Sequence, residues 1–127
     1  MNIFVVERAP EIRKRLVAMV GRVAGINVIG EGNTVGEATG AIERGEAQSL
    51  LVGLQQTGGG DLEALARLKQ ARPALRAIVL SNSTSLQYMQ ASRAAGAEFC
   101  LDKYREFGLV PDILRKWVEA AGARPSM

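Results

Sequence analysis

Acidic, basic and hydroxyl side chains stand where short apolar segments of this chain end, so several groups that bind charge can meet around one site. Glu7 and Arg8 end one such segment, Ser81 ends another, and Lys103 follows a third. The segment at 49–54 differs, because its end is occupied by Gly53, which has no side chain. The loop that follows this segment offers glycine, amides and threonine, with no carboxylate, thiol or imidazole before Asp61. The sequence therefore predicts a site whose central reactive group is missing.

Short apolar segments alternate along the chain with segments that have the spacing of amphipathic helices. An apolar run without alternation, such as residues 49–54, is typical of a strand buried on both faces. We expect strands near 3–6, 26–30, 49–54, 77–80 and 99–101, each followed by a helix. This order predicts a parallel sheet with helices on both faces. Ligands of such sheets bind at the carboxyl ends of the strands, where the residues above would meet.

Length and composition indicate one globular domain. The chain has 127 residues, of which 47% are hydrophobic and 23% charged. We expect the domain to cover residues 1–121, with a frayed tail at 122–127. No apolar run approaches the ~20 residues of a membrane span, and the first residues already have a strand pattern, which leaves no room for a signal peptide. A cytoplasmic location is expected, without membrane binding.

The side-chain inventory excludes several kinds of chemistry. The chain contains no histidine, which makes a zinc site or a histidine-activated nucleophile improbable. The single cysteine, Cys100, lies in an apolar segment, and we expect it to be a small buried hydrophobe. Basic residues cluster at 13–15 and 22 and again at 115–116, with a net charge of +3. Without interleaved aromatics, these clusters are interpreted as solvated helix faces, and nucleic-acid binding is not expected.

The order of residues resembles the receiver domain of bacterial response regulators over essentially the full length of the chain. The matching blocks are residues 3–7, 62–65 and 78–81, together with Ala-Gly-Ala-Glu-Phe-Cys-Leu-Asp-Lys at 95–103, the most specific of them. Each block is weak alone, and their separations match the family without gaps. The resemblance implies a flavodoxin-like sheet in the order 2-1-3-4-5, with helices on both faces.

The resemblance also implies where the pocket residues of the family fall. The acidic pair falls on Glu7 and Arg8, so one acid is lost, and the phosphorylated aspartate falls on Gly53. The switch hydroxyl and the lysine fall on Ser81 and Lys103, which match the family. With one acid and two bases, the pocket disfavours both magnesium and phosphoryl transfer. We therefore expect no cofactor, no metal and no enzymatic activity. We also expect Arg8 and Lys103 to share Glu7 in an internal ion pair.

The resulting hypothesis is a degenerate stand-alone receiver that acts in two-component signalling by phosphorylation-independent protein contact. The switch aromatic of the family falls on Cys100, which predicts a largely locked conformation. The expected partner is a sensor kinase, another response regulator or a second copy of the chain. The resemblance places the interaction face on residues around the fourth helix, the fifth strand and the fifth helix: Leu86, Met89, Arg93, Asp102, Tyr104 and Arg115. Whether Met89 packs inward or lies exposed remains open at this stage.

Two alternatives remain open. The glycines at 58–60, near Lys103, could hold a small anion through backbone N–H groups, which would make the domain a ligand sensor. A different acid could also accept a phosphoryl group. The candidates are Asp61 and Asp102. We expect Asp61 to face outward at a helix start and Asp102 to face solvent or a partner, so both roles are less favoured.

Overall fold

The computed structural model describes residues 1–54, 60–82 and 86–122. Strands and helices alternate along it. The strands are β1 (Asn2–Val6), β2 (Asn27–Gly32), β3 (Ser49–Gly53), β4 (Arg76–Ser81) and β5 (Phe99–Asp102). The α-helices are α1 (Pro10–Gly21), α2 (Thr39–Glu43), α3 (Asp61–Ala71), α4 (Leu86–Ala94) and α5 (Val110–Gly122). Short 3-10 turns, η1 (Val35–Ala38) and η2 (Phe107–Leu109), precede α2 and α5.

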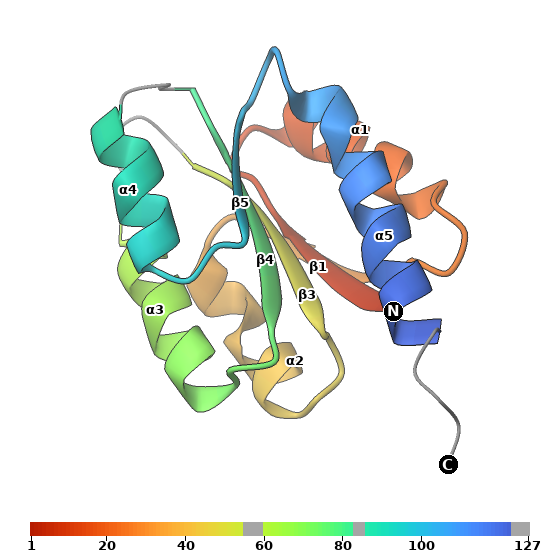
Figure 1. The fold of residues 1–127 in the computed structure, drawn as a ribbon, viewed down its shortest axis with the longest axis horizontal. Helices are drawn as coiled ribbons and strands as arrows, with labels where there is room; N and C mark the ends of the chain where they lie inside the picture. Colours follow the sequence, from red (N-terminus) through yellow and green to blue (C-terminus); the bar gives the residue numbers. More distant parts are fainter. Residues whose placement is uncertain (55–59, 83–85, 123–127) are drawn as a thin grey trace.

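The strands form one parallel sheet in the order β2-β1-β3-β4-β5. This order confirms the predicted flavodoxin-like arrangement. Figure 1 shows α1 and α5 on one face of the sheet and α2, α3 and α4 on the other. The central strand β3 is buried at every residue, as its unbroken apolar run predicts. Helices therefore cover both faces of the sheet, as predicted.

Each face of the sheet has its own hydrophobic core, because neighbouring strand residues point to opposite sides. Val5 and Leu51 face α1 and α5, where they pack with Leu16, Leu114 and Trp117. Alternate strand residues face the other helices and pack with a second set of buried side chains. That set includes Val6, Val52, Val79, Ile42, Leu65 and Leu68. The paired cores fix the strand ends that carry the polar residues.

The segment between β2 and β3 has the least regular helix. Residues 35–43 split into η1 and a five-residue α2. Gly36 and Gly40 lie in this segment, and each glycine lowers helix stability by up to about 1 kcal/mol relative to alanine. The side chain of Thr34, which precedes η1, makes no capping hydrogen bond. α1 ends at Gly21, and Gly25 (φ +86°) lies in the turn beyond it.

Cys100 departs from the prediction of a buried side chain. It is only half-buried, because β5 is an edge strand of the sheet and its outer side lacks a neighbouring strand. Its side chain still packs on the core beneath α3 and α4. Within the described part of the chain, no helix has the length and apolar character that a membrane crossing requires. The predicted frayed tail lies almost wholly outside the described residues.

Candidate functional site

Four predicted pocket residues lie together at the carboxyl edge of the sheet. Glu7 directly follows β1, Gly53 ends β3, Ser81 ends β4, and Lys103 directly follows β5. Because the strands are parallel, these ends lie side by side. The backbone N–H of Lys103 donates to the carbonyl of Ser81 at 2.9 Å, which ties two of the strand ends together. All four residues are buried.

The centre of this site is a buried ion pair. The Nζ of Lys103 lies 2.6 Å from the Oε1 of Glu7, and these side chains are 2% and 0% exposed. The other carboxylate oxygen, Oε2, accepts the backbone N–H of Ala9 at 3.0 Å. An unpaired charge inside a protein is strongly unfavourable, so each member of the pair stabilises the other in place. The site thus contains its own counter-charges.

Gly53 makes room for this ion pair. A Cβ built on Gly53 would overlap Oε1 of Glu7, and it would lie 3.0 Å from Cδ of Glu7 and 3.4 Å from Cε of Lys103. The Glu7 carboxylate therefore occupies the volume into which a side chain at position 53 would extend. The absence of a side chain on Gly53 at the end of β3 and the ion pair beside it are two parts of one packing arrangement.

Arg8 does not join this pair, contrary to the prediction that Arg8 and Lys103 share Glu7. Its side chain is exposed, and among the described residues no ion pair links it to Glu7. The chain turns into α1 directly after β1, and this turn directs Arg8 outward while Glu7 remains inside. The buried part of the site therefore carries one acid and one base.

The prediction that Asp61 faces outward is wrong. Asp61 is 4% exposed, and its Oδ1 accepts the backbone N–H of Val35 at 3.0 Å. This contact joins the start of α3 to the start of η1, where the side chain of Thr34 makes no capping hydrogen bond. Asp61 therefore caps η1 through one of its carboxylate oxygens. The glycines at 58 and 59, on which the anion-site alternative depended, lie outside the described residues.

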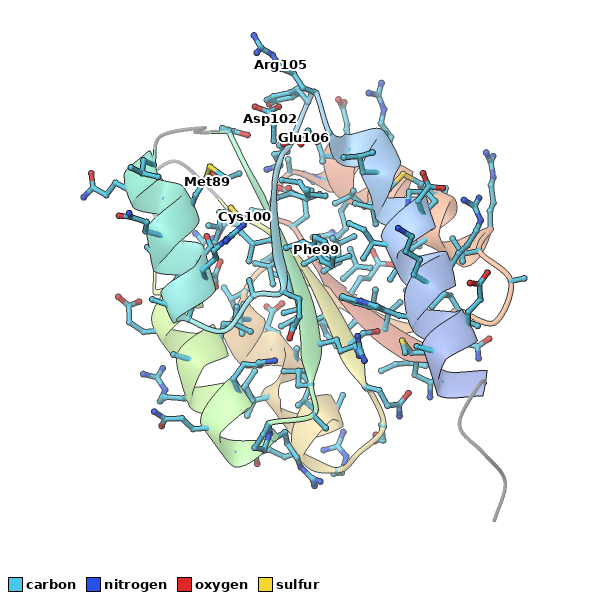
Figure 2. The ribbon with its side chains drawn as sticks, in the orientation of Figure 1. Met89, Phe99, Cys100, Asp102, Arg105 and Glu106 are labelled. Atoms are coloured by element: carbon cyan, nitrogen blue, oxygen red, sulfur yellow. The ribbon has the colours of Figure 1, made fainter. Side chains whose placement is uncertain are left out.

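Asp102, the other alternative acid, closes the turn after β5. Its Oδ1 accepts the backbone N–H groups of Arg105 at 2.7 Å and Tyr104 at 2.9 Å. These two hydrogen bonds, that from Arg105 above all, hold the pKa of Asp102 below its usual range. The backbone N–H of Asp102 in turn donates to Glu106 at 2.9 Å. Figure 2 shows Asp102, Arg105 and Glu106 together at the end of the molecule beyond β5.

The residues present do not fit the magnesium ion that the resemblance to receivers implies. The carboxylate at the site, Glu7, is bound to Lys103. The position at which the resemblance implies a second acid is occupied by Arg8, which is exposed. Magnesium is usually bound through one or two carboxylates and keeps several waters. Across residues 1–54, 60–82 and 86–122, no three acidic, cysteine or histidine side chains lie close enough to hold a metal ion.

The residues predicted as an interaction face are divided between two places. Leu86 and Tyr104 are 68% and 70% exposed, and Arg93 is also exposed. Met89 is half-buried and lies on the side of α4 nearer β5 (Figure 2), which answers the question left open by its helical phase. Arg115 lies elsewhere, in a hollow between α1 and α5. Sequence reasoning missed that hollow, although its two clusters of basic residues were visible.

No family model and no curated protein matches the sequence, whereas solved structures match it over nearly its full length. The signal receiver domain of NarL from Mycobacterium tuberculosis has a TM-score of 0.80 at 16% identity, covering 93% of this chain and 95% of that one. A CheY-like response regulator receiver domain protein from Methanospirillum hungatei has a TM-score of 0.79 at 18% identity, with 98% of each chain covered. The response regulator domain of Thermotoga maritima CheB has a TM-score of 0.75 at 17% identity, again with 98% of each covered.

These matches define the class of fold. The chain has the flavodoxin-like fold of CheY-like response regulator receiver domains, and its sheet has the order 2-1-3-4-5 that the resemblance implied. At identities below 20% the likeness establishes the fold, while the function depends on the site itself.

Proposed function

We propose that this chain is a receiver-type domain of two-component signalling that passes its signal by protein contact, without being phosphorylated. The observation that carries the proposal is the Glu7–Lys103 ion pair, which fills the space beside Gly53. A phosphoryl acceptor requires a nucleophile at this place, and glycine supplies none. The Lys103 ammonium already has a buried partner, so no phosphoryl group is needed to balance its charge.

The proposed contact surface comprises exposed residues on and after α4 and β5. Leu86 and Tyr104 provide apolar contact area, and Arg93 provides charge beside it. Exposed aromatic and aliphatic side chains with flanking arginine are characteristic of protein interfaces. The proposed partner is a sensor kinase, a response regulator or a second copy of this chain, in the cytoplasm.

Phosphorylation at another acid is the competing proposal, and intact-mass spectrometry tests it. The protein is incubated with magnesium and a small phosphodonor such as acetyl phosphate. We expect no increase in mass, because Asp61 and Asp102 already accept backbone hydrogen bonds. A gain of one phosphoryl group would overturn the phosphorylation-independent mechanism.

Affinity capture from the native cell tests the contact surface. We expect a two-component protein, or the chain itself, to be recovered equally with and without phosphodonor, and to be lost with Arg93→Glu. The matched control is Lys14→Glu, an exposed charge reversal on α1 across the sheet. Equal loss with both variants would indicate a general charge effect, and recovery that depends on the phosphodonor would contradict the proposal.

A further inference from the structure

A hollow of about 530 Å³ lies between α1 and α5, on the face of the sheet opposite α4. Its volume is within the roughly 300–1,000 Å³ range of small-molecule sites. The residues that line it come from α1 and the turn after it, from η2 and from α5. They are Arg15, Ala18, Met19, Arg22, Val23, Phe107, Pro111 and Arg115.

The hollow combines an apolar floor with an arginine rim. Met19, Val23 and Phe107 supply the floor. Arg15 lies on α1, and Arg22 directly follows the last residue of that helix; both are exposed. Their separation of seven residues places them on one side of the helix, about two turns apart. This arrangement brings together the two basic clusters of the sequence, because α1 and α5 pack against each other.

The three guanidinium groups remain available to an incoming anion. Among the described residues, no ion pair involves Arg15 or Arg22, whereas Arg115 contacts Asp112 at 2.6 Å. That pair is exposed on both sides, with side chains 58% and 65% exposed, and such pairs contribute little. Guanidinium groups match carboxylates, phosphates and sulfonates through paired hydrogen bonds.

A second hollow of about 250 Å³ adjoins the first. The two share Arg15 and Phe107, and the second also contacts Ile12, Lys103 and Tyr104. The combined space gives room for an extended apolar body beyond the arginine rim. A nucleic-acid backbone would leave this apolar floor unused, which argues against a polyanion as the occupant.

We propose that the α1–α5 hollow binds a small organic anion with an apolar body. Its carboxylate, phosphate or sulfonate group meets the arginines, and its apolar part covers Met19, Val23 and Phe107. Such a ligand contacts both α1 and α5 and therefore stabilises the native state. It gives a domain without a phosphoryl acceptor a chemical input, and Tyr104, which lines the second hollow, is also part of the contact surface proposed above.

The first test uses anilinonaphthalene sulfonate, an aryl sulfonate whose fluorescence rises in apolar sites. We expect saturable binding at one site, with displacement by decanoate and much weaker displacement by decanol, which has the same apolar chain without the charge. Arg15→Gln combined with Arg22→Gln is expected to weaken binding by about tenfold or more, because charge-assisted hydrogen bonds are lost. The matched control, Arg93→Gln on α4, is expected to bind as the wild type does.

A second variant examines the floor independently of charge. Met19→Gln keeps a side chain of similar length at a half-buried position and is expected to weaken binding severalfold. Circular dichroism melts establish that each variant is folded. Equal binding by the double arginine variant and the wild type would overturn the proposal, as would equal displacement by decanol and decanoate, or displacement by duplex DNA. None of these three outcomes bears on the mass and capture experiments, so the two proposals can fail separately.

Discussion

The buried ion pair between Glu7 and Lys103 can be tested by a double-mutant cycle. The variants are Lys103→Met, Glu7→Gln and the two combined. Lys103→Met removes the ammonium and keeps the volume of the side chain, so the Glu7 carboxylate remains inside the protein without its counter-charge. Glu7→Gln removes the negative charge and keeps an oxygen that can accept the N–H of Ala9. The combined variant removes both charges.

The expected magnitude follows from the burial of the two side chains, which are 2% and 0% exposed. Breaking a buried pair by removing one partner typically costs about 3–5 kcal/mol of the free energy of unfolding. Replacing both partners by neutral groups of similar volume often costs little. We therefore expect Lys103→Met alone to be destabilised by about 3–5 kcal/mol, and the combined variant to be more stable than Lys103→Met by about 2 kcal/mol or more.

Urea unfolding, followed by circular dichroism and by the fluorescence of Trp117, measures these differences. Trp117 is the only tryptophan and is 5% exposed, so its emission reports the core beneath α5. The control is Arg115→Met, because the Arg115–Asp112 pair has the same 2.6 Å separation but is exposed. That substitution is expected to cost less than about 1 kcal/mol. Additive effects of the two single substitutions at Glu7 and Lys103, or equal costs for Lys103→Met and Arg115→Met, would refute the reasoning from burial.

Three further predictions concern other parts of the site. Gly53→Ala is expected to cost about 1–3 kcal/mol in urea unfolding, because its Cβ overlaps Glu7, whereas Gly21→Ala meets no atom within 4 Å and is expected to be neutral or stabilising. Asp61→Ala is expected to cost about 1–3 kcal/mol by leaving the Val35 N–H without its acceptor, and to speed hydrogen exchange at that amide; unchanged exchange would contradict this. The pKa of Asp102 is lower in the folded protein than in the unfolded chain, where it is about 3.9. The ionised carboxylate therefore stabilises the fold at pH values above about 3.9, and this stabilisation disappears as the pH falls through the lower pKa of the folded state. Melting temperatures measured against pH should therefore decline less in acid for Asp102→Asn than for the wild type, and identical acid profiles would show that the turn does not depend on the charge.

The sheet and most helices could be predicted because local signals and tertiary packing agree. A helix was expected after the strand at 49–54, and α3 is observed at Asp61–Ala71, with Pro73 beyond its end. The central strand was equally clear, since both of its faces are buried. The segment at 35–43 was harder, because glycines weaken its helical pattern and a contact from a distant residue, Asp61, fixes its start. The local pattern of apolar and polar residues gives no sign of such a long-range contact.

The sequence indicated which residues lie at the shared edge of the sheet, but only partly which of them form an ion pair. The strand order brings Glu7, Gly53, Ser81 and Lys103 together, because the carboxyl ends of parallel strands share one edge of the sheet. The direction in which the chain leaves β1 decides whether Arg8 or Lys103 can contact Glu7. The spacing of residues along the sequence does not reveal this direction. Arg8 lies next to Glu7 in sequence and is exposed, whereas Lys103 is 96 positions away and forms the bond.

Gly53 and the ion pair constrain each other, so an aspartate introduced at position 53 would not by itself create a phosphoryl-accepting pocket. Its side chain would need the volume that the Glu7 carboxylate occupies, and moving Glu7 would break its contacts with Lys103 and with the N–H of Ala9. A second carboxylate would then compete for a single lysine, and the position where the resemblance to receivers implies a further acid would still be the exposed Arg8. Phosphoryl chemistry at this site therefore requires coordinated changes at positions 53 and 8 together with a new placement of Glu7. Single substitutions toward that chemistry therefore conflict with the present packing, and this conflict is the physical basis for the proposal that the domain acts by surface contact.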